Sequence, residues 1–232
     1  MECRRIGLWE DWKTWTPRGR ALVFMLAASS IWCLLAEFYG FCSMRTFTFF
    51  ISLPALSLLT VLAVRDRLVG DGRLWRGVMI GAAAGFAATV AYDLFRVPFV
   101  FSRSWGLDDV VPALPLFKVF PMFGAMILGG SSETAEAQTV GWIYHFSNGI
   151  TFGIMFTALV GERLASRWLW AIAMAVGIEM ALLLTPYTTT FSIPLTMTFV
   201  AVTLAAHLIF GATLGLSGRW LEYRKLFTPG NR

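Results

Sequence analysis

The sequence predicts an all-α fold, a polytopic membrane bundle of about six transmembrane helices. Apolar side chains make up 57% of the 232 residues, and only 14% of the residues are charged. A soluble chain of this length carries far more charge on its surface. The apolar residues also gather into runs of about 20, which is the length that a helix needs to cross a bilayer.

The expected spans follow one another with short connections and one long one. They are Ala21–Phe41, Thr46–Val64, Val78–Phe101, Val140–Val160, Leu169–Tyr187 and Met197–Ser217. Pro54 interrupts the second span, and a membrane helix tolerates such a proline as a kink. The first span starts too far into the chain, and lacks the small-residue cleavage site, for a signal peptide. We therefore expect one transmembrane domain over residues 21–217, with cytoplasmic tails at 1–20 and 218–232.

Lysine and arginine indicate the orientation of this domain. They concentrate in residues 1–20, 65–76, 163–167 and 219–232, which the expected topology places on one side. The opposite side has only Arg45, Arg103 and Lys118. Basic residues favour the cytoplasmic side, so both termini are expected there. The net charge of +5 then reflects topology and contact with anionic lipids, and not nucleic-acid binding.

Tryptophan supports the same topology. Most of the tryptophans lie in tails, in loops or near span ends, as interfacial anchors do. Trp9, Trp12 and Trp15 are spaced to form one face of a short amphipathic helix on the inner surface. Trp32 is the exception, because it falls inside the first span.

The segment Ser102–Thr139 is a long outer loop whose second half is apolar but too short to cross a bilayer. We expect a re-entrant or interfacial segment that caps the outer face. A hydrophobic loop packed on neighbouring helices is the alternative.

The two histidines, His145 and His207, open the segments HFSNGITFG and HLIFGATLG, which share the pattern His-x3-Gly-x3-Gly. A spacing of four keeps residues on one face of a helix. Each imidazole is therefore in line with a strip of small residues, which allows close packing of helices in a membrane. An ionisable group inside a membrane is costly, so both histidines are candidate functional residues.

Counting about 1.5 Å per residue from the cytoplasmic ends places Glu37, Asp93 and His145 at one level, about 24–25 Å up. Glu179 and His207 lie lower, at about 16–17 Å. The small residues Gly81, Gly85 and Thr89 precede Asp93 at a spacing of four on a helix antiparallel to that of His145. Asp93 is therefore expected against His145, where a carboxylate orients the imidazole and raises its basicity.

These depths predict a cavity that opens toward the outer leaflet beneath part of Pro112–Leu128. The candidate catalytic residues are Asp93, His145, Glu37, Glu179 and His207. The candidate substrate-binding residues are Trp32, Tyr92, Arg96, Tyr144 and Asn148.

Several of these residues also have a purely structural interpretation. The histidines can simply hydrogen-bond across helices, and the glycine strips can serve packing alone. Asp93 and Arg96 can form an ion pair at i, i+3. Glu37 can lie in the outer interface and contact water.

Residues 144–216 resemble the YagU-like proteins, uncharacterised bacterial inner-membrane proteins. The matching features are His145 with Asn148, then Thr185-Pro186 followed by Phe191 and Pro194, and His207 in the last helix. The resemblance implies a bacterial inner-membrane protein and brings no activity with it.

Four functions remain open at this point. The first is an enzyme that uses acid–base chemistry on a lipophilic, lipid- or isoprenoid-like substrate, since buried carboxyl groups and aromatic faces suit such chemistry. The second is a proton- or ion-coupled transporter or channel. The third is a protein that binds haem or a metal through His145 and His207, and the fourth a structural subunit. Membrane lipids are the expected partners; the sequence does not define a cofactor or an oligomeric state.

Overall fold

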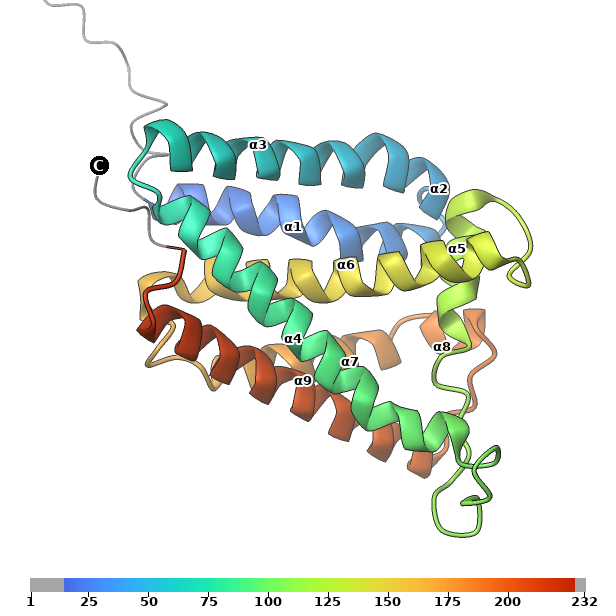
Figure 1. Cartoon of the computed structure of the whole chain (residues 1–232). Helices are drawn as coiled ribbons and strands as arrows, with labels where there is room; N and C mark the ends of the chain where they lie inside the picture. Colours follow the sequence, from blue (N-terminus) through green and yellow to red (C-terminus); the bar gives the residue numbers. More distant parts are fainter. Residues whose placement is uncertain (1–14, 228–232) are drawn as a thin grey trace, which may run out of the picture.

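The computed structural model describes residues 15–227, and all regular structure in that range is helical (Figure 1). The elements are α1 (Pro17–Phe38), α2 (Met44–Phe47), the π-helical turn η1 (Thr48–Ser52), α3 (Leu53–Val69), α4 (Arg73–Phe101), α5 (Val119–Leu128), α6 (Ala135–Val160), the 3-10 turn η2 (Gly161–Arg163), α7 (Trp170–Leu183), α8 (Tyr187–Thr190) and α9 (Met197–Tyr223). The predicted all-α membrane bundle is confirmed.

Five helical segments are long and apolar enough to cross a membrane: Pro17–Phe38, Met44–Val69, Arg73–Phe101, Ala135–Arg163 and Met197–Tyr223. Each continues a few residues beyond one of the expected spans at one end or at both. The expected span Leu169–Tyr187 is wrong in its length, because α7 has only 14 residues and is about 21 Å long. Thr185 precedes a proline and disfavours helix, so the rest of the crossing is made by a turn and by α8.

The first helix begins earlier than expected, at Pro17, with Thr16 as its N-cap. Pro17 fits this position because the first helical N–H needs no intrahelical partner. Trp15 is buried against Gly77 and packs with Val23 and Ala28, so it does not serve as an interfacial anchor. Trp9 and Trp12 lie outside the described residues.

The second span runs unbroken through Pro54 because the chain widens into the π-helical turn η1 just before it. Its outer surface is apolar and largely exposed, with Phe50 and Val61 among the most exposed side chains. Such a surface suits contact with lipid. Figure 1 shows this helix at the edge of the bundle, beside α1.

The helix α4 is the common wall of the bundle, since it packs against α6 on one side and α9 on the other. On the α6 side, Gly81 lies against Gly153, and Gly85 lies against the backbone of Gly149. This close approach confirms the predicted pairing of the third and fourth spans. The helix α7 packs on α9 through Gly211, which lies against the backbone of Ile172.

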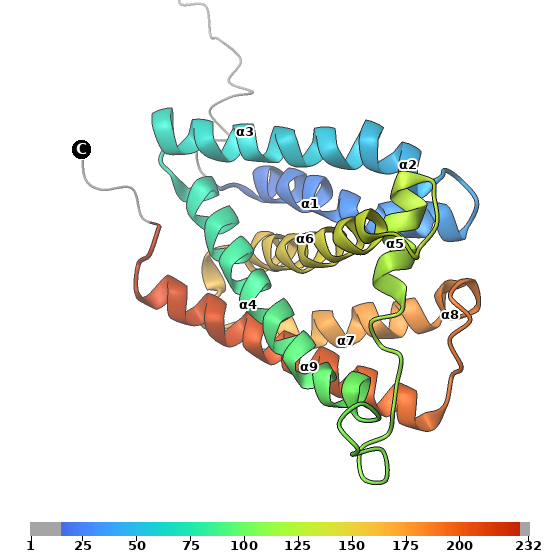
Figure 2. The same cartoon turned by 45° about the vertical axis from the view of Figure 1, so that its right-hand side comes forward.

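The outer end of the bundle is covered by the segment between α4 and α6. Figure 2 shows that α5 crosses this end, next to α6. Gly124 and Gly141 allow the contact, since a Cβ on either would collide with backbone of the facing segment. The expected interfacial segment is therefore a short helix that packs on α6.

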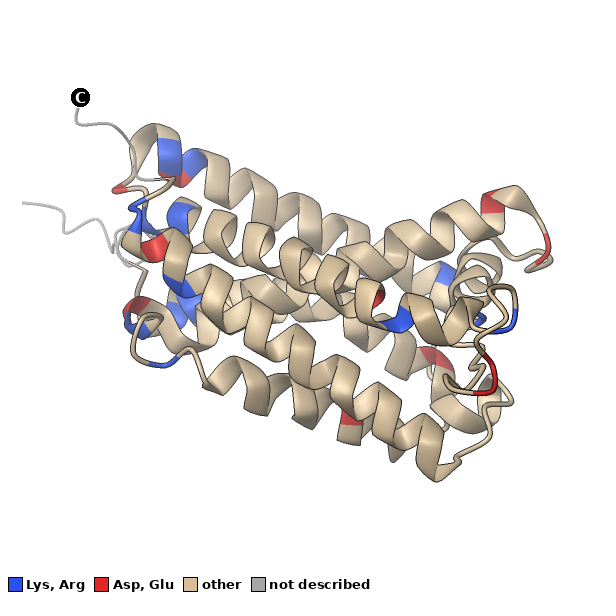
Figure 3. Cartoon of the chain, turned by 60° about the horizontal axis from the view of Figure 1, so that its bottom comes forward, with Lys and Arg blue, Asp and Glu red and all other residues tan. Residues whose placement is uncertain are grey.

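Lysine and arginine residues gather at one end of the bundle, at the left in Figure 3. There Arg73 pairs with Glu162 at 3.0 Å, and Arg76 donates to the backbone oxygen of Glu222. The far end has few basic residues among those described, which is the asymmetry expected from the sequence.

Candidate active site

Asp93 of α4 and His145 of α6 meet across the glycine seam. His145 Nε2 lies 2.9 Å from Asp93 Oδ2 and 3.1 Å from Oδ1. Both side chains are largely buried, with relative exposures of 12% and 15%. The prediction that these two residues face each other is confirmed.

Arg96 lies one turn after Asp93 on α4 and is also buried, with Nη1 3.3 Å from Asp93 Oδ1. Its Nη2 donates a hydrogen bond to the backbone oxygen of Leu116, in the segment that covers the outer end. The guanidinium lies over the rings of Tyr92 and Phe117, at 4.6 and 5.0 Å from their centroids. Asp93 thus contacts an imidazole and a guanidinium at the same time.

A second pair joins α7 and α9. His207 Nδ1 lies 3.3 Å from Glu179 Oε2 and 2.9 Å from the backbone oxygen of Thr203. Glu179 is buried, with 4% relative exposure. The sequence placed both residues at one depth, and the structure shows that they are partners.

Tyr92 lies between the two pairs. Its ring centroid is 6.1 Å from that of His145 and 5.0 Å from that of His207. Tyr92 and Asp93 are consecutive on α4, so the helix presents the carboxylate to α6 and the phenol ring toward α9 and the cavity. Depth counting placed the two histidine–carboxylate pairs in separate layers. In the structure, both pairs lie beside Tyr92.

The hydrogen bonds assign the proton on His207. A carbonyl oxygen only accepts, so Nδ1 donates to Thr203 and Nε2 is left with a lone pair. His145 uses Nε2 toward Asp93, and its Nδ1 makes no hydrogen bond to the described residues. Each imidazole is thus oriented by a carboxylate and keeps one nitrogen for another molecule.

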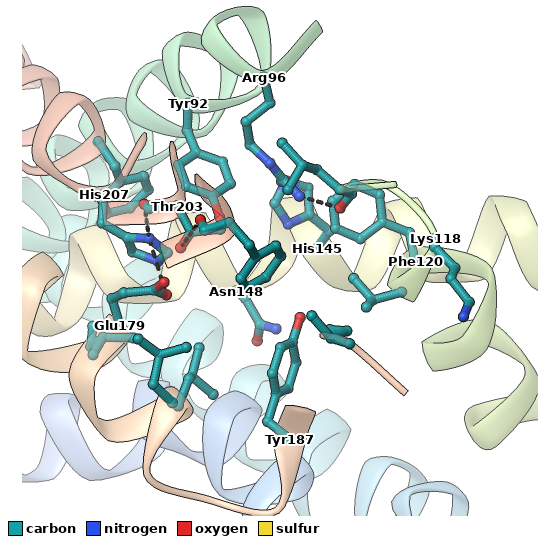
Figure 4. A pocket seen from close by; sticks show the side chains of 18 of the residues that line it. Tyr92, Arg96, Lys118, Phe120, His145, Asn148, Glu179, Tyr187, Thr203 and His207 are labelled. Carbon is teal, nitrogen blue, oxygen red and sulfur yellow. Dashed lines mark hydrogen bonds and ion pairs between the residues drawn. The ribbon is translucent and has the colours of Figure 1, made fainter. Parts of the chain in front are cut away.

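The two pairs border a cavity of about 300 Å³ (Figure 4). Tyr92, Arg96, His145, Asn148 and Glu179 line it, as does His207 from α9. Residues 113–120 and Phe123 form its outer cover, which we call the roof. The predicted roof within Pro112–Leu128 agrees with this segment. Two buried polar atoms of the lining side chains, Arg96 Nε and Asn148 Oδ1, have no hydrogen-bond partner among the described residues.

Three candidate residues lie elsewhere. Trp32 is 48% exposed and points away from the cavity, because it lies about 100° around α1 from the lining residue Ile31. Glu37 accepts a hydrogen bond from the backbone N–H of Met44 and so fixes the turn after α1. Tyr144 donates to the backbone oxygen of Ser30 at 2.8 Å, which joins α6 to α1.

Several lining residues were not predicted, and Tyr187 is one of those near the outer end. Figure 4 shows its hydroxyl directed into the cavity, while the Lys118 ammonium points away from the other labelled groups. Phe120 of the roof stacks on His145, with ring centroids 4.2 Å apart. An aromatic residue with a polar tip at the outer end of the fifth span was a usable signal for Tyr187. Nothing in the sequence indicated the stacking of Phe120.

Within residues 15–227, no three His, Cys, Asp or Glu side chains come together as a metal site. Each imidazole is instead paired with its own carboxylate. The arrangement suits proton transfer, since it holds two oriented bases and two phenols around one cavity.

Comparison with known proteins gives one short similarity. No protein-family model matches the chain, and no solved structure matches it. The CDP-archaeol synthases of two strains of Halobacterium salinarum are 40% identical to it over 62 residues, which is 26% of this chain and 32% of theirs. The chain therefore matches these curated relatives over about a third of their length.

Proposed function

We propose that the protein is an integral membrane enzyme that acts by acid–base chemistry on a lipophilic substrate, a lipid or isoprenoid-like molecule. One observation carries this proposal: two histidine–carboxylate pairs from four helices border the same cavity, each with a ring nitrogen left for a ligand. Groups with these properties are what proton transfer to and from a bound molecule requires.

In this proposal His145 takes a proton from the substrate through Nδ1, and Asp93 stabilises the imidazolium that results. His207 is a second base in this proposal: its Nε2 lone pair takes a proton from the substrate, Glu179 stabilises the imidazolium that forms, and the same Nε2 then returns that proton to another atom of the substrate. Tyr187 and Asn148 orient the polar part of the substrate by hydrogen bonds, and the aromatic lining excludes water.

The similarity to CDP-archaeol synthase supports a lipid as the substrate class, since that name belongs to a lipid-modifying membrane enzyme. We also propose that residues 144–216 are related to the YagU-like proteins. A bacterial-type inner membrane with both termini cytoplasmic is the proposed location.

The test is turnover of lipids by the purified protein. The protein is incubated with total membrane lipids, and products are followed by mass spectrometry in the original chain and in His145→Gln, His207→Gln and Glu133→Gln. We expect each histidine variant to lose about 100-fold in rate, because a general acid or base contributes at least that factor. Glu133 is exposed in the outer loop, so its variant is the control. Full activity in both histidine variants would remove these residues from the reaction.

Proton-coupled transport is the second candidate, because Tyr92 bridges the two pairs into a continuous row of titratable groups. Proton uptake into vesicles that contain the protein, followed with a pH-sensitive dye, distinguishes the two functions. Transport would be favoured if His207→Gln abolishes proton uptake and the original chain converts no lipid.

A further inference from the structure

The cavity has an apolar side away from the roof. It is formed by Ile31 of α1, Phe152 of α6, and Ala175 and Ile178 of α7, which we call the side slot. Ala175 is buried, whereas Ile31, Phe152 and Ile178 are each half-buried although they line the cavity. These three side chains therefore keep part of their surface uncovered by other protein atoms.

Helix packing leaves this side open. The helix α7 packs on α9 and makes no comparable contact with α1 or α6, whereas α4 closes the opposite side against both α6 and α9. Figure 2 shows α4 crossing the bundle with α7 behind it. Between α7 and the packed pair of α1 and α6, the cavity is therefore limited by side chains and not by closely packed helices.

The slot is closed at both ends. Toward the roof, Leu182 packs on the apolar cluster that contains Leu34 and Phe191. Toward the cytoplasmic end, Phe152 contacts two core clusters, one around Ala27 of α1 and one around Phe210 of α9. The opening is therefore about one helical turn inward of Leu182, at a depth where the surroundings of a spanning bundle are hydrocarbon.

We propose that a hydrocarbon chain of the lipid substrate enters the cavity sideways through the side slot. This inference rests on the proposed function and names the route by which that substrate binds. A lipid in the bilayer brings its chains to this depth without crossing water, and the slot offers them only apolar contacts. The polar part of the lipid then meets the polar side chains that line the cavity, such as Asn148, Tyr187 and His207.

Neighbouring residues on α7 connect the slot to the chemistry. Glu179 faces His207 on α9, and Ile178, about 100° around the helix, faces the cavity beside Ile31. A molecule whose chain contacts Ile178 therefore has its next atoms beside the Glu179–His207 pair. The slot fixes which part of the lipid reaches the two imidazoles.

The test is photo-crosslinking in vesicles of phosphatidylethanolamine and phosphatidylglycerol. The probe is phosphatidylglycerol with a diazirine at the end of one acyl chain, and labelled residues are mapped by mass spectrometry. We expect labels at Ile31, Phe152 and Ile178 in addition to the outer surface of the bundle. Labels confined to outward-facing residues such as Val61 would overturn the proposal.

Blocking variants sharpen the test. Ile178→Trp fills the slot from α7 and Ile31→Trp fills it from α1, and each should lower slot labelling at least fivefold. Met180→Trp is the matched control, because Met180 is exposed on α7 and does not line the cavity. Unchanged slot labelling in whichever blocking variant folds would contradict the route.

This result can be separated from that for the proposed function. His145→Gln should keep the slot labels while losing turnover. If the slot residues are labelled and the histidine variants keep full turnover, the binding route is supported and the proposed acid–base chemistry is rejected. If turnover depends on the histidines but the slot residues are not labelled, the acid–base chemistry is supported and the binding route is rejected.

Discussion

Asp93 holds two neighbours at once, the imidazole of His145 and the guanidinium of Arg96. The ion pair and the histidine pair were alternative interpretations of the sequence, and the structure contains both. Arg96 is buried with 4% relative exposure, so it depends on this carboxylate for its charge balance. A loss of activity in an Asp93 variant therefore has a structural component that must be measured separately.

We predict that Asp93→Asn lowers the free energy of unfolding by about 3 kcal/mol, because it leaves a buried guanidinium without a counter-charge. Adding Arg96→Met removes that charge and should recover most of the loss. Thermal unfolding of the parent, the single variant and the double variant in one detergent measures both effects. A double variant no more stable than Asp93→Asn would show that the pair is not the source of the loss.

Depth counting along each span placed Asp93 with His145 at one level and Glu179 with His207 at a lower one, and the structure pairs them in the same way. It did not predict that both pairs border one cavity. It could not place Trp32, because the distance along a helix axis says nothing of the direction around it. Glu37 and Tyr144 reach the expected level, but turns and neighbouring helices supply closer partners for their polar atoms. Residues contributed by the roof depend on contacts between distant segments, which no local pattern encodes.

At the scale of elements, small residues decide which helices touch. The strip on α4 predicted its contact with α6, since a spacing of four keeps these positions on one face. The pattern was less informative for α7, whose apolar run continued past the real end of the helix at Leu183. Hydropathy alone does not register the helix-ending effect of Pro186.

We predict that Gly85→Leu lowers the free energy of unfolding by about 2 kcal/mol, a typical cost of overpacking. A side chain there meets the backbone of Gly149, which cannot move aside without separating the two helices. Gly177→Leu is the matched control, because a Cβ at Gly177 meets nothing within 4 Å. Thermal unfolding checks both variants, and equal stability of the two would contradict the role of the seam.

For the whole molecule, the distribution of basic residues predicts that both termini are cytoplasmic. Variants without the three native cysteines would carry a single new one, at Asp109 or Ala165, both exposed at opposite ends of the bundle. In intact cells, a membrane-impermeant maleimide should label Asp109→Cys and leave Ala165→Cys unlabelled until the membrane is opened. The reverse pattern would invert the orientation.

Arg96 also ties the roof to the histidine pair, since it donates to Leu116 and contacts Asp93. If the roof moved away, the guanidinium would lose its hydrogen bond to Leu116, and the electrostatic environment of Asp93 would change with it. The position of the roof and the proton occupancy of His145 are therefore thermodynamically linked. Such linkage is reciprocal, so a proton gained by His145 alters the stability of the closed roof by the same free energy that closure contributes to holding the proton.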